Sequence, residues 1–166
     1  MKNIVYIFLI SILPLIELRG AIPVGAALGV PYYTNYIAAV IGNMLPIPFI
    51  LLFIPKILDS LGKFRLFAPV VEWLRKKADK HSARILNEGG EKKRKFRLDG
   101  AFFGLLFFVM LPIPGTGAWS GALVAALFRL PKLRAFIAIL LGVLLCGVIM
   151  SLASYGVVGF LNFLVS

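Results

Sequence analysis

The strongest constraint on this chain is that its charged residues are gathered in one central block between two long apolar blocks. Between Lys56 and Asp99 there are 13 basic and six acidic residues, whereas the other 122 positions carry five basic residues and one acidic residue. The chain is 60% hydrophobic and 15% charged, against roughly 45–50% and 25% in soluble domains. This pattern predicts an all-α integral membrane protein with one polar insert.

The insert, residues 56–99, is expected to contain an amphipathic basic helix that lies on the membrane. Phe64, Val71 and Ile85 belong to a series of apolar residues that recur at helical spacing among the charges. Such a helix binds anionic headgroups, and an excess of Lys and Arg marks the cytoplasmic side. We therefore expect the bilayer as a partner and a cytoplasmic insert, and the apolar flanks argue against nucleic acid.

The two apolar blocks resemble each other at an interval of 100 residues. Seven identities fall within the 29 positions from 14 to 42. The most informative are Pro31 with Pro131 and Gly42 with Gly142. We divide the chain into a first repeat, residues 1–55, the insert, residues 56–99, and a second repeat, residues 100–166.

Each repeat has a break rich in Pro and Gly inside an apolar stretch, at residues 14–23 and 111–121. The ten apolar residues before the first break would form about 15 Å of helix, half of a hydrocarbon layer about 30 Å thick. We therefore expect each break to be the tip of a re-entrant helical hairpin. Irregular backbone at that depth is tolerated only against protein or a watery cavity, so the two tips should meet.

A transmembrane helix is expected after each hairpin. The first should cover about residues 36–52, and the second about residues 133–150, followed by a shorter helix interrupted by glycine. The second hairpin has basic residues at both ends, whereas the first ends in tyrosines, which suit the opposite interface. This makes an inverted repeat, as in transporters whose site lies at the midplane.

Glu17 and Arg19 are the only charged residues that this layout places at membrane depth. A charge at the centre of a lipid-exposed helix costs about 2.5–3.5 kcal/mol. A structural explanation is that the two side chains neutralise each other or bind tip carbonyls and hold the loop. A functional explanation is that Arg19 binds a phosphate or carboxylate and Glu17 carries a coupling proton.

The other candidate residues also lie at the breaks. Short helices starting at Pro23 and Ala118 would direct their positive ends to the midplane. Glycines allow backbone N–H groups to approach a ligand, although tight packing also explains them. The hydroxyls can bind a ligand or their own helix, and Trp119 can stack on a ligand or pack. The predicted substrate-binding residues are Arg19, Gly20, Pro23, Pro114, Gly115, Thr116, Gly117, Ala118, Trp119 and Ser120, with Glu17 for proton coupling.

Two motifs carry a resemblance to a known family. Residues 17–23, ELRGAIP, and residues 111–121, LPxPGTGAWxG, resemble the signatures of the bacterial and archaeal small multidrug export protein family. That family is similar in plan to the DedA (VTT-domain) superfamily, which has paired re-entrant hairpins and members implicated in moving undecaprenyl phosphate or phospholipid. The resemblance implies a multi-pass protein of the cytoplasmic (inner) membrane. DedA proteins have functional arginines in the second hairpin, whereas here both charges are in the first.

These features predict a proton-coupled transporter or flippase that moves an anionic lipid-linked phosphate through a midplane site. The alternative is a small multidrug exporter of amphipathic cations, with Glu17 as the counter-ion and Arg19 as the release trigger. The tips lack a His or acid pair to serve a nucleophile, so we expect no enzyme activity, no cofactor and no metal. A purely structural role would leave both charges replaceable. Because 166 residues make a thin wall around a cavity, we expect a homodimer.

Overall fold

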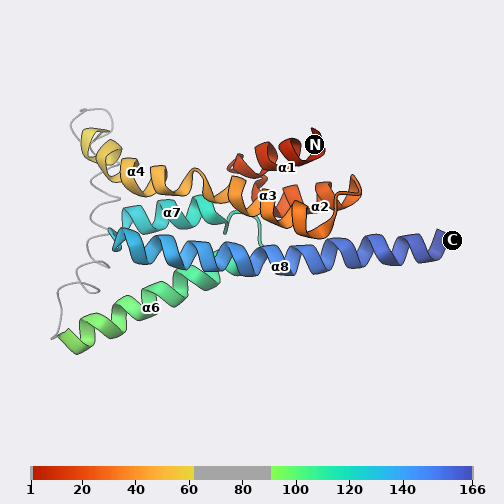
Figure 1. Cartoon of the computed structure of the whole chain (residues 1–166). Helices are drawn as coiled ribbons and strands as arrows, with labels where there is room; N and C mark the ends of the chain where they lie inside the picture. Colours follow the sequence, from red (N-terminus) through yellow and green to blue (C-terminus); the bar gives the residue numbers. More distant parts are fainter. Residues whose placement is uncertain (1, 62–90, 166) are drawn as a thin grey trace.

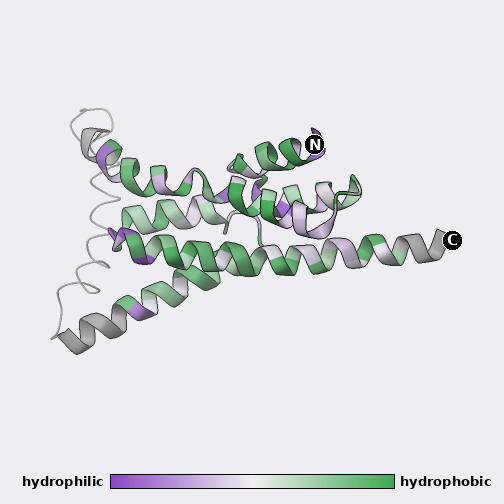
Figure 2. Ribbon diagram, in the orientation of Figure 1, coloured by the Kyte–Doolittle hydropathy of each residue, from purple (hydrophilic) through white to green (hydrophobic). Residues whose placement is uncertain are grey.

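A computed structural model of the chain describes residues 2–61 and 91–165, and the regular elements in these ranges are all α-helices. They are α1 (Lys2–Ile12), α2 (Glu17–Ala27), α3 (Tyr32–Met44), α4 (Ile47–Leu61), α6 (Glu91–Met110), α7 (Ala118–Leu127) and α8 (Lys132–Val165). Two segments are long and apolar enough to cross a membrane, Tyr32–Ile57 and Lys132–Phe160. The helices are largely hydrophobic, and hydrophilic residues gather where α8 begins and α4 nears its end (Figure 2). The prediction of an all-α membrane protein is therefore confirmed in its helix content and in the presence of apolar segments that can cross a membrane.

The longest helix, α8, runs through the whole molecule, and the other helices lie along it (Figure 1). The pair α1 and α2 lies over the half of α8 that leads to the C-terminus, and the pair α6 and α7 over the other half. Helices α3 and α4 follow one another along both halves. The two pairs of helices therefore meet near the middle of α8.

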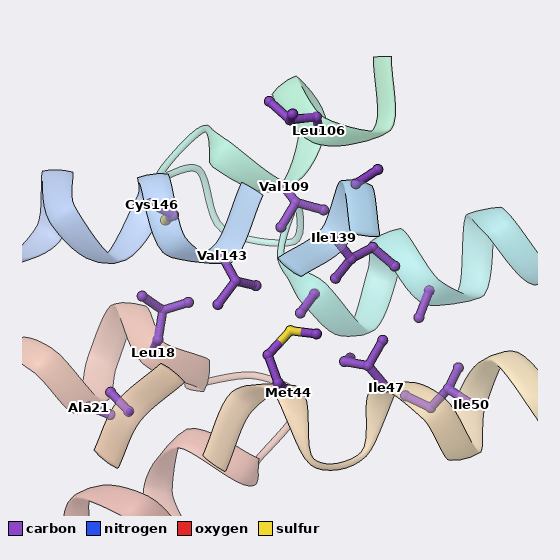
Figure 3. Close-up of a cluster of buried hydrophobic side chains, with 14 of the residues drawn as sticks. Leu18, Ala21, Met44, Ile47, Ile50, Leu106, Val109, Ile139, Val143 and Cys146 are labelled. Atoms are coloured by element: carbon purple, nitrogen blue, oxygen red, sulfur yellow. The ribbon is translucent and has the colours of Figure 1, made fainter. Parts of the chain in front are cut away.

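The apolar core at this meeting point draws side chains from both halves of the chain (Figure 3). Leu18 of α2, Met44 of α3, Val109 of α6 and Val143 of α8 are all buried there. Glycine allows close approach, because a Cβ on Gly142 would lie 2.8 Å from the Cβ of Val109. Burial of these side chains holds the two pairs of short helices against α8.

The turn from α2 to α3 and the turn from α7 to α8 are built alike. The N–H of Val30 donates to the carbonyl of Gly25, and 100 residues later the N–H of Leu130 donates to the carbonyl of Ala125, each at 3.0 Å. Buried positions repeat at the same interval in the helices that follow. They are Asn35, Ala38, Ala39, Gly42 and Asn43 in α3, and Ala135, Ala138, Ile139, Gly142 and Val143 in α8.

The first break is shorter than predicted, because Pro23 does not begin a helix. It lies inside α2, which starts at Glu17, so the break covers residues 13–16. Proline lacks an N–H and frees a carbonyl one turn earlier, but neighbouring groups in a membrane bundle can satisfy that carbonyl. The second break covers residues 111–117, and α7 begins at Ala118 as expected.

The predicted crossing helices differ from the structure in detail. The crossing predicted at residues 36–52 falls within the apolar segment Tyr32–Ile57, but this segment is divided at Leu45 and Pro46, which separate α3 from α4. The expected pair of helices after residue 133 is instead the single helix α8, because glycines such as Gly147 serve close packing, here against Tyr36. Most of the predicted amphipathic insert, residues 62–90, lies outside the described residues.

Candidate functional site

Glu17 begins α2, but its carboxylate caps a different helix. The side chain is buried, and the residue has φ 52, a left-handed conformation that is uncommon outside glycine. The carboxylate accepts hydrogen bonds from the N–H groups of Ala118, at 3.3 Å, and Trp119, at 3.1 Å. The N-cap residue of α7, Gly117, has no side chain to do this. Glu17 therefore supplies both the hydrogen bonds and the negative charge that the start of α7 requires.

Arg19 binds the segment that connects α6 to α7. Its guanidinium donates to the carbonyl oxygens of Val109 (3.2 Å), Leu111 (2.6 Å) and Ile113, and to the hydroxyl of Thr116 (3.0 Å). The last carbonyls of a helix have no partner within it, and a cation near them is favourable. Arg19, which lies close to the first break, thus stabilises the backbone conformation of the second break.

Glu17 and Arg19 therefore connect the first break to the second. In the ranges that the structure describes, no salt bridge joins the two side chains to each other. The structural explanation predicted that the side chains bind carbonyl groups of the breaks, and Arg19 does so. Glu17 binds N–H groups instead.

The hydroxyl and indole groups of the second motif add further contacts around the breaks. The indole N–H of Trp119 donates to the carbonyl of Ile12, the last residue of α1, at 3.1 Å. The hydroxyl of Ser120 donates to the carbonyl of Gly117 at 3.1 Å, and the hydroxyl of Thr116 lies 2.9 Å from the carbonyl of Ile113. Both hydroxyls therefore bind their own segment. Trp119 ties the start of α7 to the end of α1.

Two glycines of the second motif are needed for different reasons. A Cβ on Gly117 would overlap the Glu17 carboxylate, so any side chain there would displace the cap of α7. Gly115 has φ 86 and open space where a Cβ would be, so its backbone conformation, rather than crowding, favours glycine.

A cavity of about 490 Å³ lies between the two breaks. This is within the range of about 300–1,000 Å³ that ligand pockets occupy. Most of its lining is apolar, and its polar side chains are those of Glu17, Arg19 and Ser120. The lining residues are Pro14, Leu15, Ile16, Glu17, Arg19, Gly20, Pro112, Pro114, Gly115, Gly117, Ser120 and Met150.

The structure brings together part of the predicted site at this cavity. Arg19, Gly20, Pro114, Gly115, Gly117, Ser120 and Glu17 line it. Thr116, Ala118 and Trp119 bind the two charged side chains beside it, whereas Pro23 is within α2. Five lining residues were missed by the sequence prediction: Pro14, Leu15, Ile16, Pro112 and Met150. The first four lie in the predicted breaks and could have been predicted, but Met150 carries no local signal.

The chemistry available at the cavity comes from one carboxylate, one guanidinium and one hydroxyl. The thiol of Cys146 is buried beside Arg19. Across residues 2–61 and 91–165, no three His, Cys, Asp or Glu side chains come together as metal ligands. Such a site can hold an ion or an amphipathic molecule and can exchange a proton at Glu17.

The fold and the cavity define a class of protein, a helical membrane protein in which two broken helical stretches meet around charged side chains. Residues 17–149 match the family described as "putative small multi-drug export protein", and the chain belongs to that family. The match includes both motifs that suggested it. Comparison with curated proteins and with solved structures finds no match.

Proposed function

We propose that this protein is a secondary transporter that exports amphipathic compounds through the cavity between the two breaks. The family description refers to small-molecule export. The observation that carries the proposal is a largely apolar cavity with one carboxylate and one guanidinium in its wall. An amphipathic cation needs apolar walls for its body and a negative group for its charge, and Glu17 is that group.

In this proposal each broken stretch is a re-entrant hairpin, and the two form an inverted repeat as in the DedA superfamily. Helices α1 and α7 have 11 and 10 residues, and at about 15 Å they would reach half of the hydrocarbon layer. The matching turns and buried positions at an interval of 100 residues support a repeat. The positions of the two pairs along α8 (Figure 1) support entry from opposite faces.

The orientation follows from charge. Lys132 and Arg134 lie where α8 begins, and basic residues favour the cytoplasmic side of a bacterial or archaeal inner membrane. The insert, residues 56–99, is on the same side in this proposal.

Transport depends on Glu17 leaving α7. As a carboxylate, Glu17 accepts two N–H bonds at the start of α7. When it binds a proton or a substrate cation, it becomes a weaker acceptor for these bonds. The second break then loses its contact with Glu17 at the start of α7. Because proton and substrate compete for one carboxylate, binding of either opposes binding of the other, which is the linkage that proton antiport requires.

A second candidate function is movement of an anionic lipid-linked phosphate, such as undecaprenyl phosphate or a phospholipid. It is favoured by Arg19, whose Nε is buried without a hydrogen-bond partner in the wall of the cavity. A phosphate that replaced the Glu17 carboxylate would meet the N–H groups of Ala118 and Trp119 together with this guanidinium. The proton on Glu17 would then move with the lipid.

We also propose that the protein acts as a homodimer and leaves its substrate chemically unchanged. Leu15 is 96% exposed and Ile113 is 50% exposed, so both breaks lie at the surface of one copy. Lipid cannot satisfy free backbone groups at that depth, whereas a second copy covers them.

Proteoliposomes with a proton gradient and a lipophilic cationic dye test the export function. Wild-type protein should drive dye movement, and Glu17→Gln should reduce it to the level of empty liposomes, because glutamine offers neither charge nor proton. Asp99→Asn is the matched control, since Asp99 pairs at 3.5 Å with Arg134 in a half-exposed salt bridge. It should transport like wild type.

The same vesicles with a fluorescent anionic phospholipid test the second candidate. If wild-type protein moves the lipid but not the dye, and Arg19→Gln no longer moves the lipid, the function is lipid translocation and not export of amphipathic compounds. Dye movement at the wild-type rate in Glu17→Gln would contradict the export mechanism. Circular dichroism should show that each variant keeps its helix content.

A further inference from the structure

A second recess lies between α1 and α3, apart from the cavity between the breaks. An apolar groove of about 500 Å³ runs between the two helices. A second cavity, of about 470 Å³, lies where the helices begin. Most of its lining is apolar, but Lys2 and Asn3 belong to it together with the turn from Leu28 to Pro31. Both are lined by Ile4 and Thr34, so the two adjoin, and together they form a recess with Lys2 at one end, the polar end, and the apolar groove at the other.

We propose that this recess binds an anionic phospholipid, with the headgroup phosphate at Lys2 and one acyl chain in the groove. A phospholipid joins a charged phosphate to a hydrocarbon chain, and the recess joins a cationic cavity to an apolar groove in the same order.

The polar end selects for negative charge. Lys2 is the charged residue among the described residues of its lining, which include no acidic side chain. An ammonium near a membrane surface attracts anionic lipid, by about 1 kcal/mol for each Lys or Arg. The hydroxyl-bearing Thr34 lies where the two parts of the recess join.

Tyrosines indicate the depth of the recess in the membrane. Tyr32 and Tyr33 pack edge to face at 5.1 Å between ring centroids, and Tyr33 is 76% exposed and lines the groove. Exposed tyrosines of membrane proteins gather at the headgroup level. The polar end is therefore at that level, and the groove from Thr34 to Ile41 leads about 10 Å into the hydrocarbon.

The inner end of the groove is closed by helix contact. A Cβ on Gly42 would overlap the hydroxyl of Ser11, so α1 and α3 touch there. Nearer their starts, small Ala38 belongs to the lining, together with Val5 and Ile37, which are about half exposed. A recess that opens at headgroup level and closes within one leaflet accommodates one chain of a lipid of that leaflet.

Photo-crosslinking of the full chain in vesicles tests the proposal. The vesicles contain phosphatidylcholine with a trace of phosphatidylglycerol that has a photoreactive group on one acyl chain. Mass spectrometry should place the label on residues 4–8 and 33–41, and added phosphatidylglycerol should compete, whereas phosphatidylcholine should not. Lys2→Gln should weaken this competition about fivefold. Lys132→Gln, the first residue of α8, is the matched control and should leave labelling of α1 and α3 unchanged.

Thr34→Phe, which fills the junction of the two parts, should reduce labelling even if headgroup attraction persists. Two outcomes would contradict the proposed lipid site: equal competition by phosphatidylcholine, or unchanged labelling in both Lys2→Gln and Thr34→Phe. Either would show that the groove contacts only bulk lipid. Competition by the cationic dye, or a crosslink between two copies at α1 and α3, would assign the recess to substrate or to a dimer contact instead.

Discussion

The two breaks contribute to the centre of the molecule in opposite ways. The first turn of α2, directly after the first break, supplies two side chains, the Glu17 carboxylate and the Arg19 guanidinium. The second break and the start of α7 supply backbone carbonyls and N–H groups. Each charge meets the helix end of opposite sign, because Arg19 lies at the end of α6 and Glu17 at the start of α7. The two motifs therefore form one structure, in which the polar groups at each break are satisfied by residues near the other.

The second break is also longer. Gly42 packs against Ser11 in the first half of the chain, and Gly142 packs against Val109 in the second. The glycines are 100 residues apart (142 − 42), but their partners are 98 apart (109 − 11), so the second half has two more residues between these contacts. This extra length falls across the break, where the carbonyls of Leu111 and Ile113 accept from Arg19.

Gly117→Ala should have the largest effect on the contact between the breaks. The added methyl group would overlap the Glu17 carboxylate and expel it from α7, which we expect to cost about 3 kcal/mol. Thermal unfolding in detergent measures the loss. In a double-mutant cycle, Glu17→Ala should cost much less in the Gly117→Ala background than alone. Gly100→Ala, with open space around it, is the control. Additive effects of the two substitutions would contradict the contact.

Arg19→Lys should have a smaller effect, because it keeps the charge but loses the planar fork of donors. Lysine cannot reach three carbonyls and a hydroxyl together, so we expect a loss of about 1–2 kcal/mol. Unfolding in the same detergent measures it. Arg134→Lys in the half-exposed pair with Asp99 should change stability by much less. Equal effects at the two arginines would show that charge alone matters at the second break.

The smallest effect should come from the turns that the two halves share. Gly29 and Arg129 are equivalent residues with φ 68 and 51, a conformation that strains a residue with a side chain. Arg129→Gly should therefore stabilise the protein by up to about 1 kcal/mol, and Gly29→Ala should destabilise it by about as much. Chemical denaturation of both variants gives the sign of the change in the free energy of unfolding. Stabilisation by both substitutions would contradict the likeness of the turns.

Local signals were sufficient to find where the site lies. The clusters of Pro and Gly marked both breaks, and Gly117 followed by Ala118 marked the start of α7. The cost of charge at membrane depth singled out Glu17 and Arg19. Their binding partners were not predictable, since the groups that they contact are between 90 and 102 residues away in the chain.

Proline was the least reliable local signal. Pro23 lies within α2, yet Pro46 separates α3 from α4. The missing N–H is the same in both cases, and the outcome depends on whether neighbouring helices satisfy the freed carbonyl and on how the chain packs. Glycines of α8 were misleading for a related reason, because Gly142 and Gly147 provide close helix contacts without ending the helix.

Sequence alone was enough to predict an all-helical membrane protein with two interrupted apolar stretches and a pair of charged residues, Glu17 and Arg19, in the first of them. Apolar length, charge position and helix-breaking residues act within a few turns of the chain, so they can be read locally. Tertiary structure alone decided that Glu17 caps α7, that Arg19 holds the end of α6, and that Met150 joins the cavity wall. These contacts satisfy backbone groups at the ends of distant helices, and they exist only when packing along α8 brings the two breaks together.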